Sequence, residues 1–565
     1  MSSDAGRGAA GGAVPGGVTL EGHLRTPVPT NEPVLGYAPG SAERAEIQAK
    51  LAGMAGREIE IPILVGGEEI RTGDTGEVVM PHDHGHVLAR YHKAGPAEVR
   101  AAIESGRAAW QEWSGWSWQD RAAVFLRAAE LLAGSRRATV NAATMLGQSK
   151  TVHQAEIDSA CELIDFWRFN LHFAARLYAE QPASAPGTWN QMDYRPLEGF
   201  VYAITPFNFT SIGGNLPTVP AMMGNVSIWK PARTSLYSSW YVMEVLREAG
   251  LPPGVINFVP GNSAQISETL LASPDLAGIH FTGSTQTFQL LWRTVAENLE
   301  GYRSYPRIVG ETGGKDFILA HASADPDALA VAIVRGGFEY QGQKCSAASR
   351  VYIPESLWPA VRDRVGEMLA GIRMGDPQDF ENFLCAVIDE AAYRSISAYI
   401  EHARSSDEAE IVFGGGASDE KGWFIEPTVI LAREPGFRLM CEEIFGPVVT
   451  VHVYPDRQWS ETMDLVDTTS PYALTGAVFA TDRAAVRQAL VALRHAAGNF
   501  YVNDKPTGAV VGQQPFGGAR ASGTNDKAGS FLNLVRWVSP RSIKETFVPP
   551  TDYRYPFLAR DAGGR

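Results

Sequence analysis

The alternation of short apolar runs with helical segments between residues 199 and 311 constrains the fold more than any other feature of the chain. Strand-like runs cover residues 199–205, 225–230, 255–259, 278–282 and 307–311, and amphipathic segments separate most of them. Short apolar strands that alternate with helices are typical of a parallel sheet covered on both faces. We therefore expect a doubly wound α/β fold whose ligands bind at the carboxyl ends of the strands.

A second α/β unit follows the first. Its strand candidates are residues 317–319, 350–353, 411–413, 448–453, 475–479 and 499–502. A hairpin at residues 58–72 and a long helical segment at residues 152–180 precede the first unit. The chain of 565 residues exceeds one compact core, so two or three domains are expected.

Three segments lack the pattern of a packed core. Residues 1–40 are rich in glycine and proline and predict a flexible tail that lies loosely over the surface. Residues 181–196 predict a protruding ribbon, and residues 540–565 a tail that packs on a partner surface. The N-terminus lacks the apolar run of a secretory signal, and its few arginines and several acidic residues argue against a mitochondrial transit peptide.

Composition limits the location and the partners of the protein. A net charge of −14 disfavours nucleic acids and anionic membranes, and no apolar run is long enough for a transmembrane helix. The cysteines are too few for a disulfide framework and none are spaced as a zinc pair, which favours a reducing, cytoplasmic location; they are Cys161, Cys345, Cys385 and Cys441.

Three histidines, His82, His84 and His86, recur at a spacing of two. Metal binding is one interpretation. Solvated imidazoles on a strand edge or loop are favoured, because Asp83 is the only acidic neighbour and no cysteine is near. We therefore expect no metal site.

Cys345 is the candidate nucleophile. It directly follows Lys344 within the glycine- and glutamine-rich stretch 337–349, and a nearby lysine favours the thiolate, which is the reactive form. A packing cysteine remains the alternative on these residues alone.

Polar residues at the predicted strand ends supply further candidates. Asn208 can donate to an oxyanion, Glu311 can act as a general base, and the turn from Gly283 to Thr287 precedes a helix whose N-terminus suits a phosphate. Lys230 and Glu443 can bind ribose hydroxyls. Each residue alone also fits a solvated or capping role.

Taken together, these stretches resemble the aldehyde dehydrogenase superfamily, from about residue 40 to the end of the chain. The matching stretches occur in the order of the superfamily: Pro206-Phe207-Asn208, Lys230-Pro231-Ala232, Phe281-Thr282-Gly283-Ser284, Glu311-Thr312-Gly313-Gly314-Lys315, Gly342-Gln343-Lys344-Cys345 and Glu443-Ile444-Phe445-Gly446-Pro447. Residues 338–347, 498–505 and 507–526 most resemble the branch that oxidises L-glutamate γ-semialdehyde.

The resemblance implies two doubly wound α/β domains plus a small β oligomerisation ribbon. Residues 41–180 and 197–310 would form an NAD-binding domain, and residues 311–505 a catalytic domain. Residues 506–525 would form a loop that anchors the substrate, and residues 181–196 and 526–565 the ribbon and C-terminal tail.

The resemblance also implies a mechanism and its residues. Cys345 would attack the aldehyde, Asn208 would hold the oxyanion, and Glu311 would activate water against the thioester. The product would be L-glutamate, in the second step of proline catabolism, with 1-pyrroline-5-carboxylate as the source of the aldehyde. The expected cofactor is NAD, held by Thr205, Pro206, Phe207, Lys230, Gly283, Ser284, Thr285, Gln286, Thr287, Glu443 and Phe445.

Substrate contacts are expected from Glu162, Phe209, Lys344, Ser346, Gly508, Ala509 and Phe516. Some members of the branch have serine in place of Ala509, so one hydrogen bond fewer is expected here. NAD-preferring relatives often have an acidic residue where this chain has Arg233, so some use of NADP is expected.

The resemblance further implies a homodimer or higher oligomer, and a separate proline dehydrogenase as a possible partner. The alternatives are an aldehyde dehydrogenase for another substrate such as succinate semialdehyde, a binding or structural protein that has lost catalysis, and a cysteine hydrolase. Residues 507–516 argue against the first, Cys345 and Glu311 against the second, and the lack of a histidine motif against the third. Glu311 also argues against transfer of the acyl group to coenzyme A.

Overall fold

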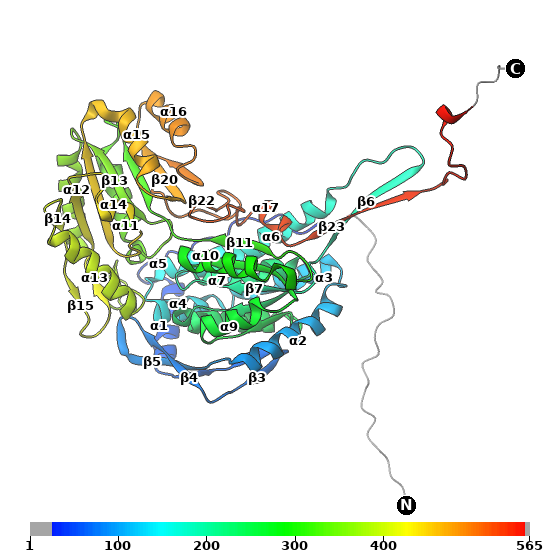
Figure 1. The fold of residues 1–565 in the computed structure, drawn as a ribbon. Helices are drawn as coiled ribbons and strands as arrows, with labels where there is room; N and C mark the ends of the chain where they lie inside the picture. Colours follow the sequence, from blue (N-terminus) through cyan, green and yellow to red (C-terminus); the bar gives the residue numbers. More distant parts are fainter. Residues whose placement is uncertain (1–24, 560–565) are drawn as a thin grey trace, which may run out of the picture.

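The computed structural model describes residues 25–559, and two α/β units meet in it, with a ribbon that projects to one side (Figure 1). The sheet of the first unit has the order β11-β10-β7-β8-β9-β2-β3. Its parallel strands are the predicted ones: β7 (Phe200–Ile204), β8 (Val226–Lys230), β9 (Ile256–Phe258), β10 (Leu276–Thr282) and β11 (Arg307–Glu311). The doubly wound fold is confirmed. Antiparallel β2 (Ile63–Val65) and β3 (Glu68–Ile70) extend one edge.

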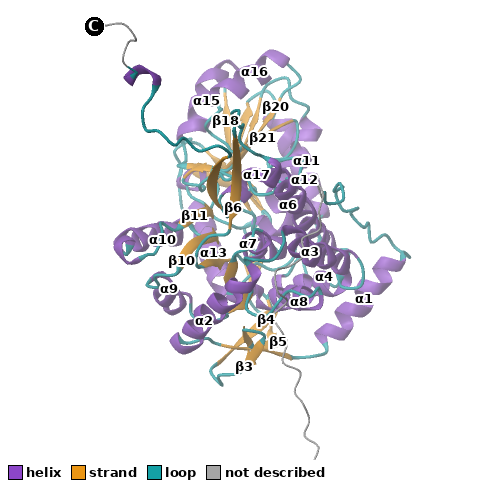
Figure 2. Ribbon diagram, turned by 90° about the vertical axis from the view of Figure 1, so that its right-hand side faces the viewer, coloured by secondary structure: helices purple, strands orange, loops and turns teal. Residues whose placement is uncertain are grey.

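Alternate residues of these strands enter cores on opposite faces of the sheet. Val226 and Ile228 of β8 belong to one buried cluster, whereas Trp229 belongs to another. Figure 2 shows helices packed around the strands. The helices of this unit are α1 (Ala42–Ala55), α2 (Pro96–Trp113), α3 (Trp118–Ala133), α4 (Arg137–Gln148), α7 (Thr210–Met222), α8 (Leu236–Glu248), α9 (Ser263–Leu271) and α10 (Thr285–Glu297).

The second unit has a sheet of order β14-β17-β18-β13-β12-β20-β21. Its strands are β12 (Asp316–Ala320), β13 (Ala348–Pro354), β14 (Ala409–Phe413), β17 (Thr428–Ala432), β18 (Val448–Tyr454), β20 (Thr475–Phe479) and β21 (Asn499–Val502). The sequence analysis missed β17, which lies between β14 and β18. The principal helices are α11 (Pro326–Phe338), α12 (Trp358–Gly371), α13 (Glu390–Arg404), α15 (Trp459–Thr468) and α16 (Arg483–Ala492).

A small sheet formed by β1 (Ile59–Ile61), β4 (Thr75–Met80) and β5 (Asp83–His92) packs beside the first unit. The first half of the hairpin predicted at residues 58–72 is split at Pro62 into β1 and β2, because proline has no N–H for the ladder. The histidine prediction is wrong for His82, which is only 2% exposed and lies 3.2 Å from the Ser149 hydroxyl. Within residues 25–559, no cluster of His, Cys, Asp and Glu side chains could hold a metal ion.

The long helical segment is interrupted by one π-helical turn. α5 (Val152–Ala155) leads into π-helical Glu156–Cys161, and α6 (Glu162–Ala179) follows. Insertions of this kind occur often at functional sites because they redirect side chains.

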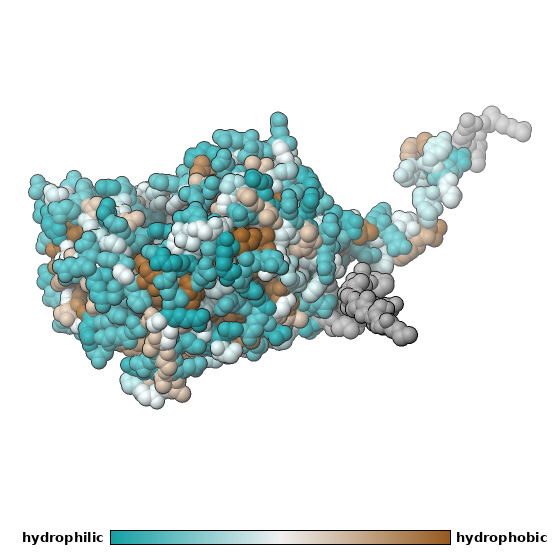
Figure 3. Space-filling view, turned by 90° about the horizontal axis from the view of Figure 1, so that it is seen from below, coloured by the Kyte–Doolittle hydropathy of each residue, from teal (hydrophilic) through white to brown (hydrophobic). Residues whose placement is uncertain are grey.

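The projecting ribbon pairs β6 (Thr188–Arg195) with β23 (Ser539–Thr546) in antiparallel register. Large apolar side chains beyond β23 are exposed, among them Tyr553 at 85% and Phe557 at 81%. Figure 3 shows hydrophobic residues along an arm that consists of this ribbon and the segment that follows β23. Exposed apolar groups of this kind are typical of surfaces that contact another protein.

The predicted flexible tail is wrong for residues 25–40, because Asn31, Glu32 and Tyr37 hydrogen-bond to side chains of the first unit. Residues 1–24, which carry the rest of that prediction, and residues 560–565 lie outside the described part. No helix in residues 25–559 has the length and apolarity needed to cross a membrane.

Candidate active site

The strand register brings the predicted cofactor residues to one edge of the first sheet. Ile204 is opposite both Lys230 and Phe281, and Thr282 is opposite Glu311. Because these strands are parallel, their carboxyl ends and the loops that follow lie side by side. The segments that begin at Thr205, Lys230, Gly283 and Glu311 therefore lie together at this edge, where sheets of this kind bind ligands in the crevice outside the strand ends.

Cys345 lies in a loop between α11 and β13, and the backbone before it is strained. Tyr340 and Gln341 adopt left-handed φ angles of 51° and 54°, which are uncommon outside glycine and are often found at functional sites. The side chain of Gln341 fixes this geometry. It donates to the carbonyls of Ser149 (3.0 Å) and Ala386 (2.7 Å), so it ties the loop to both units.

Burial raises the pKa of the Cys345 thiol well above its ordinary value, and the nearby carboxylates of Asp316 and Glu311 raise it further. Lys344 was expected to lower the pKa of the Cys345 thiol, but its ammonium is engaged elsewhere. Its ammonium lies 3.6 Å from Asp158 and 3.9 Å from Glu339, where it is neutralised. The expectation that Lys344 favours the thiolate is therefore wrong, and a base has to accept the thiol proton during attack.

Asn208 is held beside the cysteine loop. It is buried at the β7–α7 junction, and its side-chain Nδ2 donates to the carbonyl of Gln343 at 3.1 Å. A primary amide has two N–H donors, so this bond positions the group and leaves one donor for another acceptor. This arrangement is compatible with the predicted oxyanion role.

Glu311 is buried at the end of β11, and burial raises the pKa of its carboxyl to about 8. One of its oxygens accepts a hydrogen bond from the Gly518 N–H at 3.0 Å. A Cβ atom on Gly517 or Gly523 would lie 3.1 Å from the carboxylate oxygens, so these glycines leave room for it. A carboxyl group with this pKa is suited to proton transfer near neutral pH.

The cofactor side of the crevice contains a buried cation and a buried carboxylate. Lys230 is 6% exposed, and burial lowers its pKa to about 8, with no neighbouring charge in residues 25–559 that offsets the effect. A buried ammonium without a counter-ion is stabilised by ligand oxygens. The carboxylate of Glu443 accepts from the Gly314 N–H at 2.8 Å, and burial raises its pKa to about 7.

Two more features of the crevice fit a dinucleotide. The hydroxyl of Ser284 caps α10 by accepting from the Thr287 N–H at 3.2 Å, and the exposed start of this helix can bind phosphate. Phe445, with φ of 57°, contacts Phe207 edge to face at 5.8 Å between ring centroids. The residues of the crevice therefore offer partners for ribose, phosphate and an aromatic ring.

The predicted substrate side has an unforeseen cation. Lys150 is fully buried, with its ammonium 2.9 Å from Asp158 and 4.5 Å and 4.3 Å from the ring centroids of Phe209 and Tyr340. Nearby, Glu162 accepts from the Ser211 hydroxyl at 2.5 Å, and burial raises the pKa of Glu162 to about 8. Nothing in the sequence around Lys150 distinguishes it from a solvated lysine.

The loop at residues 506–525 lies against the cysteine loop. The hydroxyls of Ser346 and Thr507 are 2.8 Å apart, and Gly508 follows with φ of 93°. Phe516 exchanges both backbone hydrogen bonds with Ala528. The structure therefore brings Gly508 and Ala509, two of the predicted substrate residues, next to the residue that follows Cys345, and Thr507 joins the site as a residue that the sequence analysis missed.

Comparison with known proteins identifies the family. The model of the aldehyde dehydrogenase family matches residues 70–538. The chain belongs to the aldehyde dehydrogenase family. It is 52% identical over 535 residues to the mitochondrial delta-1-pyrroline-5-carboxylate dehydrogenase of Dictyostelium discoideum, covering 94% of this chain and 96% of that protein. With the human protein of that name it shares 50% over 529 residues, covering 94% of each.

Solved structures give the same result for this aldehyde dehydrogenase. The structure of delta-pyrroline-5-carboxylate dehydrogenase from Mycobacterium tuberculosis, bound with NAD, matches with a TM-score of 0.93 and 54% identity. The match covers 96% of this chain and all of that one. The predicted family and fold are confirmed, and the chain is an oxidoreductase.

Proposed function

We propose that this aldehyde dehydrogenase oxidises L-glutamate γ-semialdehyde to L-glutamate with NAD, as the second step of proline catabolism. Relatives near 50% identity are named for 1-pyrroline-5-carboxylate, which opens in water to this semialdehyde. The contact between Ser346 and Thr507 supports the assignment, because the Gly508–Ala509 segment follows Thr507 beside the nucleophile loop. Backbone N–H groups of such a segment can bind the α-carboxylate of an amino-acid aldehyde.

Each residue of the site then has its own role in the reaction. The Cys345 sulfur attacks the aldehyde carbon as a base takes the thiol proton, and the oxyanion accepts hydrogen bonds from Asn208 and the Cys345 N–H. Lys230 and Glu443 would hold NAD, which would supply the acceptor for the hydride of this carbon. Glu311 takes a proton from water, which attacks the thioester, releases L-glutamate and restores the thiol.

The test is the formation of NADH, followed by fluorescence, with 1-pyrroline-5-carboxylate and with succinate semialdehyde. We expect kcat/KM for the first substrate to be higher by at least about 100-fold. Succinate semialdehyde is one carbon shorter, so its carboxylate lies closer to the aldehyde, and it lacks the α-ammonium; a site built to bind a polar group discriminates against an analogue that lacks it. An equal or higher kcat/KM for succinate semialdehyde would reject the assignment.

NAD is the proposed cofactor, with some use of NADP through Arg233. This side chain is largely exposed. It forms an ion pair with Asp389 at 3.4 Å, and its exposed guanidinium is accessible to a 2′-phosphate. We expect Arg233→Glu to lower kcat/KM for NADP about tenfold through charge repulsion while NAD kinetics stay unchanged. Steady-state assays with each cofactor measure this ratio, and equal effects on both would contradict the role of Arg233.

A homodimer or higher oligomer is proposed through β6, β23 and the tail beyond them. The exposed apolar side chains of this arm support it. Light scattering at assay concentration is expected to give a mass of at least two chains, and deletion of residues 547–565 is expected to lower it. A single-chain mass for the full-length protein would disprove the proposal.

The finer assignments complete the proposal. A separate proline dehydrogenase would supply the substrate, and the location would be cytoplasmic, although several relatives are named mitochondrial. The proposed division into domains stays as given above, with the chain leaving the first sheet after Glu311 and entering the second at Asp316.

A further inference from the structure

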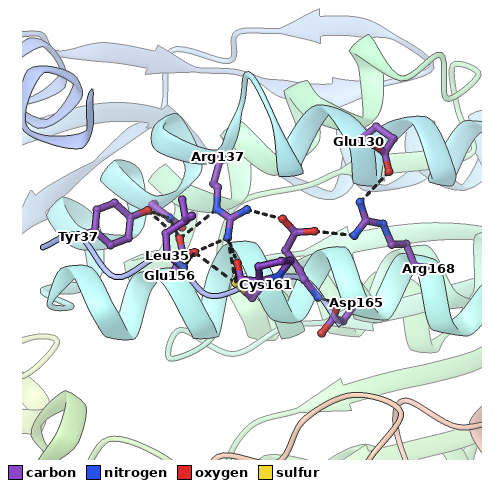
Figure 4. A network of polar contacts seen from close by, with 11 residues as sticks. Leu35, Tyr37, Glu130, Arg137, Glu156, Cys161, Asp165 and Arg168 are labelled. Atoms are coloured by element: carbon purple, nitrogen blue, oxygen red, sulfur yellow. Dashed lines mark hydrogen bonds and ion pairs between the residues drawn. The ribbon is translucent and has the colours of Figure 1, made fainter. Parts of the chain in front are cut away.

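Residues 25–41, here called the N-terminal strap, are bound to α4 and to the π-helical turn by a buried polar network (Figure 4). Glu156 accepts hydrogen bonds from the Leu35 N–H and the Tyr37 hydroxyl, both at 2.8 Å. Burial alone would raise the pKa of Glu156, but hydrogen bonds from Arg137 and Leu35 lower it below its ordinary value. The strap is therefore a fixed part of the first unit.

One strap residue reaches beyond this network to the loop at residues 506–525. The Asn31 side-chain amide donates to Asp165 Oδ2 and to the Val511 carbonyl, both at 2.8 Å, and its Oδ1 accepts from the Gln513 amide at 2.9 Å. The Glu32 N–H donates to Asp165 Oδ1 at 2.8 Å. Asn31 therefore joins α6 to the loop through hydrogen bonds on both sides.

Glu32 fixes the strap beside Asn31. Its two carboxylate oxygens each lie 2.6 Å from a guanidinium nitrogen, one of Arg137 and one of Arg168. The Arg168 guanidinium also pairs with Glu130 at 2.7 Å. Because α4 and α6 both contribute an arginine, the backbone that carries Asn31 is held at two points of the helical layer.

The loop has little regular structure of its own to fix it. Gly508 and Gly512 adopt φ angles of 93° and 81°. A Cβ atom on Gly512 would lie 2.3 Å from the ring of Phe169, so the loop backbone packs directly on α6. Its other end is held by the bond between Thr507 and Ser346.

One face of α6 contacts both the proposed substrate site and the strap. Glu162, Asp165, Phe166 and Phe169 follow the i, i+3, i+4, i+7 spacing and share that face. Glu162 points to the Ser211 hydroxyl near the site, and Asp165 points to Asn31. A shift of the loop on this face would move the Gly508–Ala509 segment relative to Glu162 and Ser346.

We propose that Asn31 is a positioning residue that fixes the loop at residues 506–525 on α6. Through this loop it sets the selectivity for aldehydes that carry a carboxylate at the end opposite the aldehyde group. The inference rests on the proposed function, because it takes the Gly508–Ala509 segment as the carboxylate site. A preformed segment binds without the cost of ordering it, so the effect appears in KM rather than in the chemical step.

Asn31→Ala is the direct test. KM for 1-pyrroline-5-carboxylate is expected to rise about tenfold, because the loop loses two hydrogen bonds and becomes mobile. kcat, KM for NAD, and kcat/KM for butanal, which has no carboxylate, are expected to stay within about twofold. An unchanged KM for 1-pyrroline-5-carboxylate, or an equal loss with butanal, would overturn the proposal.

Two further variants separate positioning from stability. Tyr37→Phe removes a strap hydroxyl that bonds Glu156 and does not touch the loop, so it is expected to lower Tm and leave KM unchanged. Gln513→Ala removes the exposed loop partner of Asn31 and is expected to raise KM. The double variant is expected to be less than additive, because both changes break the same contact. Full additivity, or a rise of KM in Tyr37→Phe, would contradict the coupling.

Hydrogen–deuterium exchange makes the result independent of the substrate assignment. Amides at residues 508–514 are expected to exchange faster in Asn31→Ala and at the wild-type rate in Tyr37→Phe. Faster exchange in a protein that does not oxidise 1-pyrroline-5-carboxylate would reject the proposed function and keep the positioning role. Unchanged exchange in Asn31→Ala would reject the positioning role itself.

Discussion

Cys345→Ala is expected to abolish aldehyde oxidation and to leave NAD binding intact. Without the sulfur there is no covalent intermediate, and a loss of about 10⁴-fold or more in kcat is usual when a nucleophile is removed. The proposed cofactor residues lie on other segments: Lys230 ends β8, and Glu443 accepts a hydrogen bond from the Gly314 N–H. The rise of Tm with added NAD is therefore expected to match that of the wild type.

Cys345→Ser and Cys441→Ala are the matched variants. Serine keeps a hydroxyl of similar size, but its much higher pKa leaves it a poor nucleophile, so this variant is expected to be as inactive as alanine. Cys441 is half-buried, and its thiol donates a hydrogen bond to the Gly436 carbonyl at 3.6 Å, so its loss is expected to leave kcat unchanged. Turnover near the wild-type rate in Cys345→Ala would reject the cysteine mechanism.

The position of the crevice could be predicted from the sequence because it depends on strand ends. Apolar runs that end at Lys230 and Glu311 predict parallel strands, and parallel strands place their carboxyl ends at one edge. The direction of each side chain could not be predicted in this way. Lys344 is next to Cys345 in sequence, yet its ammonium is paired with Asp158 and Glu339.

Long-range contacts account for most of what the sequence did not predict. Asn31 and Val511 are separated by 480 positions, and Gln341 and Ser149 by 192. Neither pair has a local pattern, because a single asparagine or glutamine in a polar segment is typical of exposed loops. The π-helical turn directs Glu156 to the strap and Asp158 to Lys150. No pattern of residue types in this segment distinguishes it from an α-helix.

Glu311→Gln is expected to separate the two halves of the reaction. The amide keeps the size of the side chain but cannot take a proton from water, so the thioester accumulates. A rapid burst of about one NADH per active site is expected, followed by steady turnover that is about 10²- to 10⁴-fold slower than in the wild type. Stopped-flow fluorescence measures both phases, and intact mass spectrometry detects the acylated protein.

The pH profile assigns the base. Glu311 acts as a carboxylate and its pKa is raised to about 8, so wild-type kcat is expected to rise with pH and to level off above about 8. Glu162 and Glu443 titrate in the same range, with pKa values of about 8 and 7. In Glu311→Gln the slow turnover is expected to increase with hydroxide concentration without a plateau. A plateau that persists near pH 8 in this variant would assign the base to another carboxyl group, and a missing burst would show that Glu311 is already needed when Cys345 attacks.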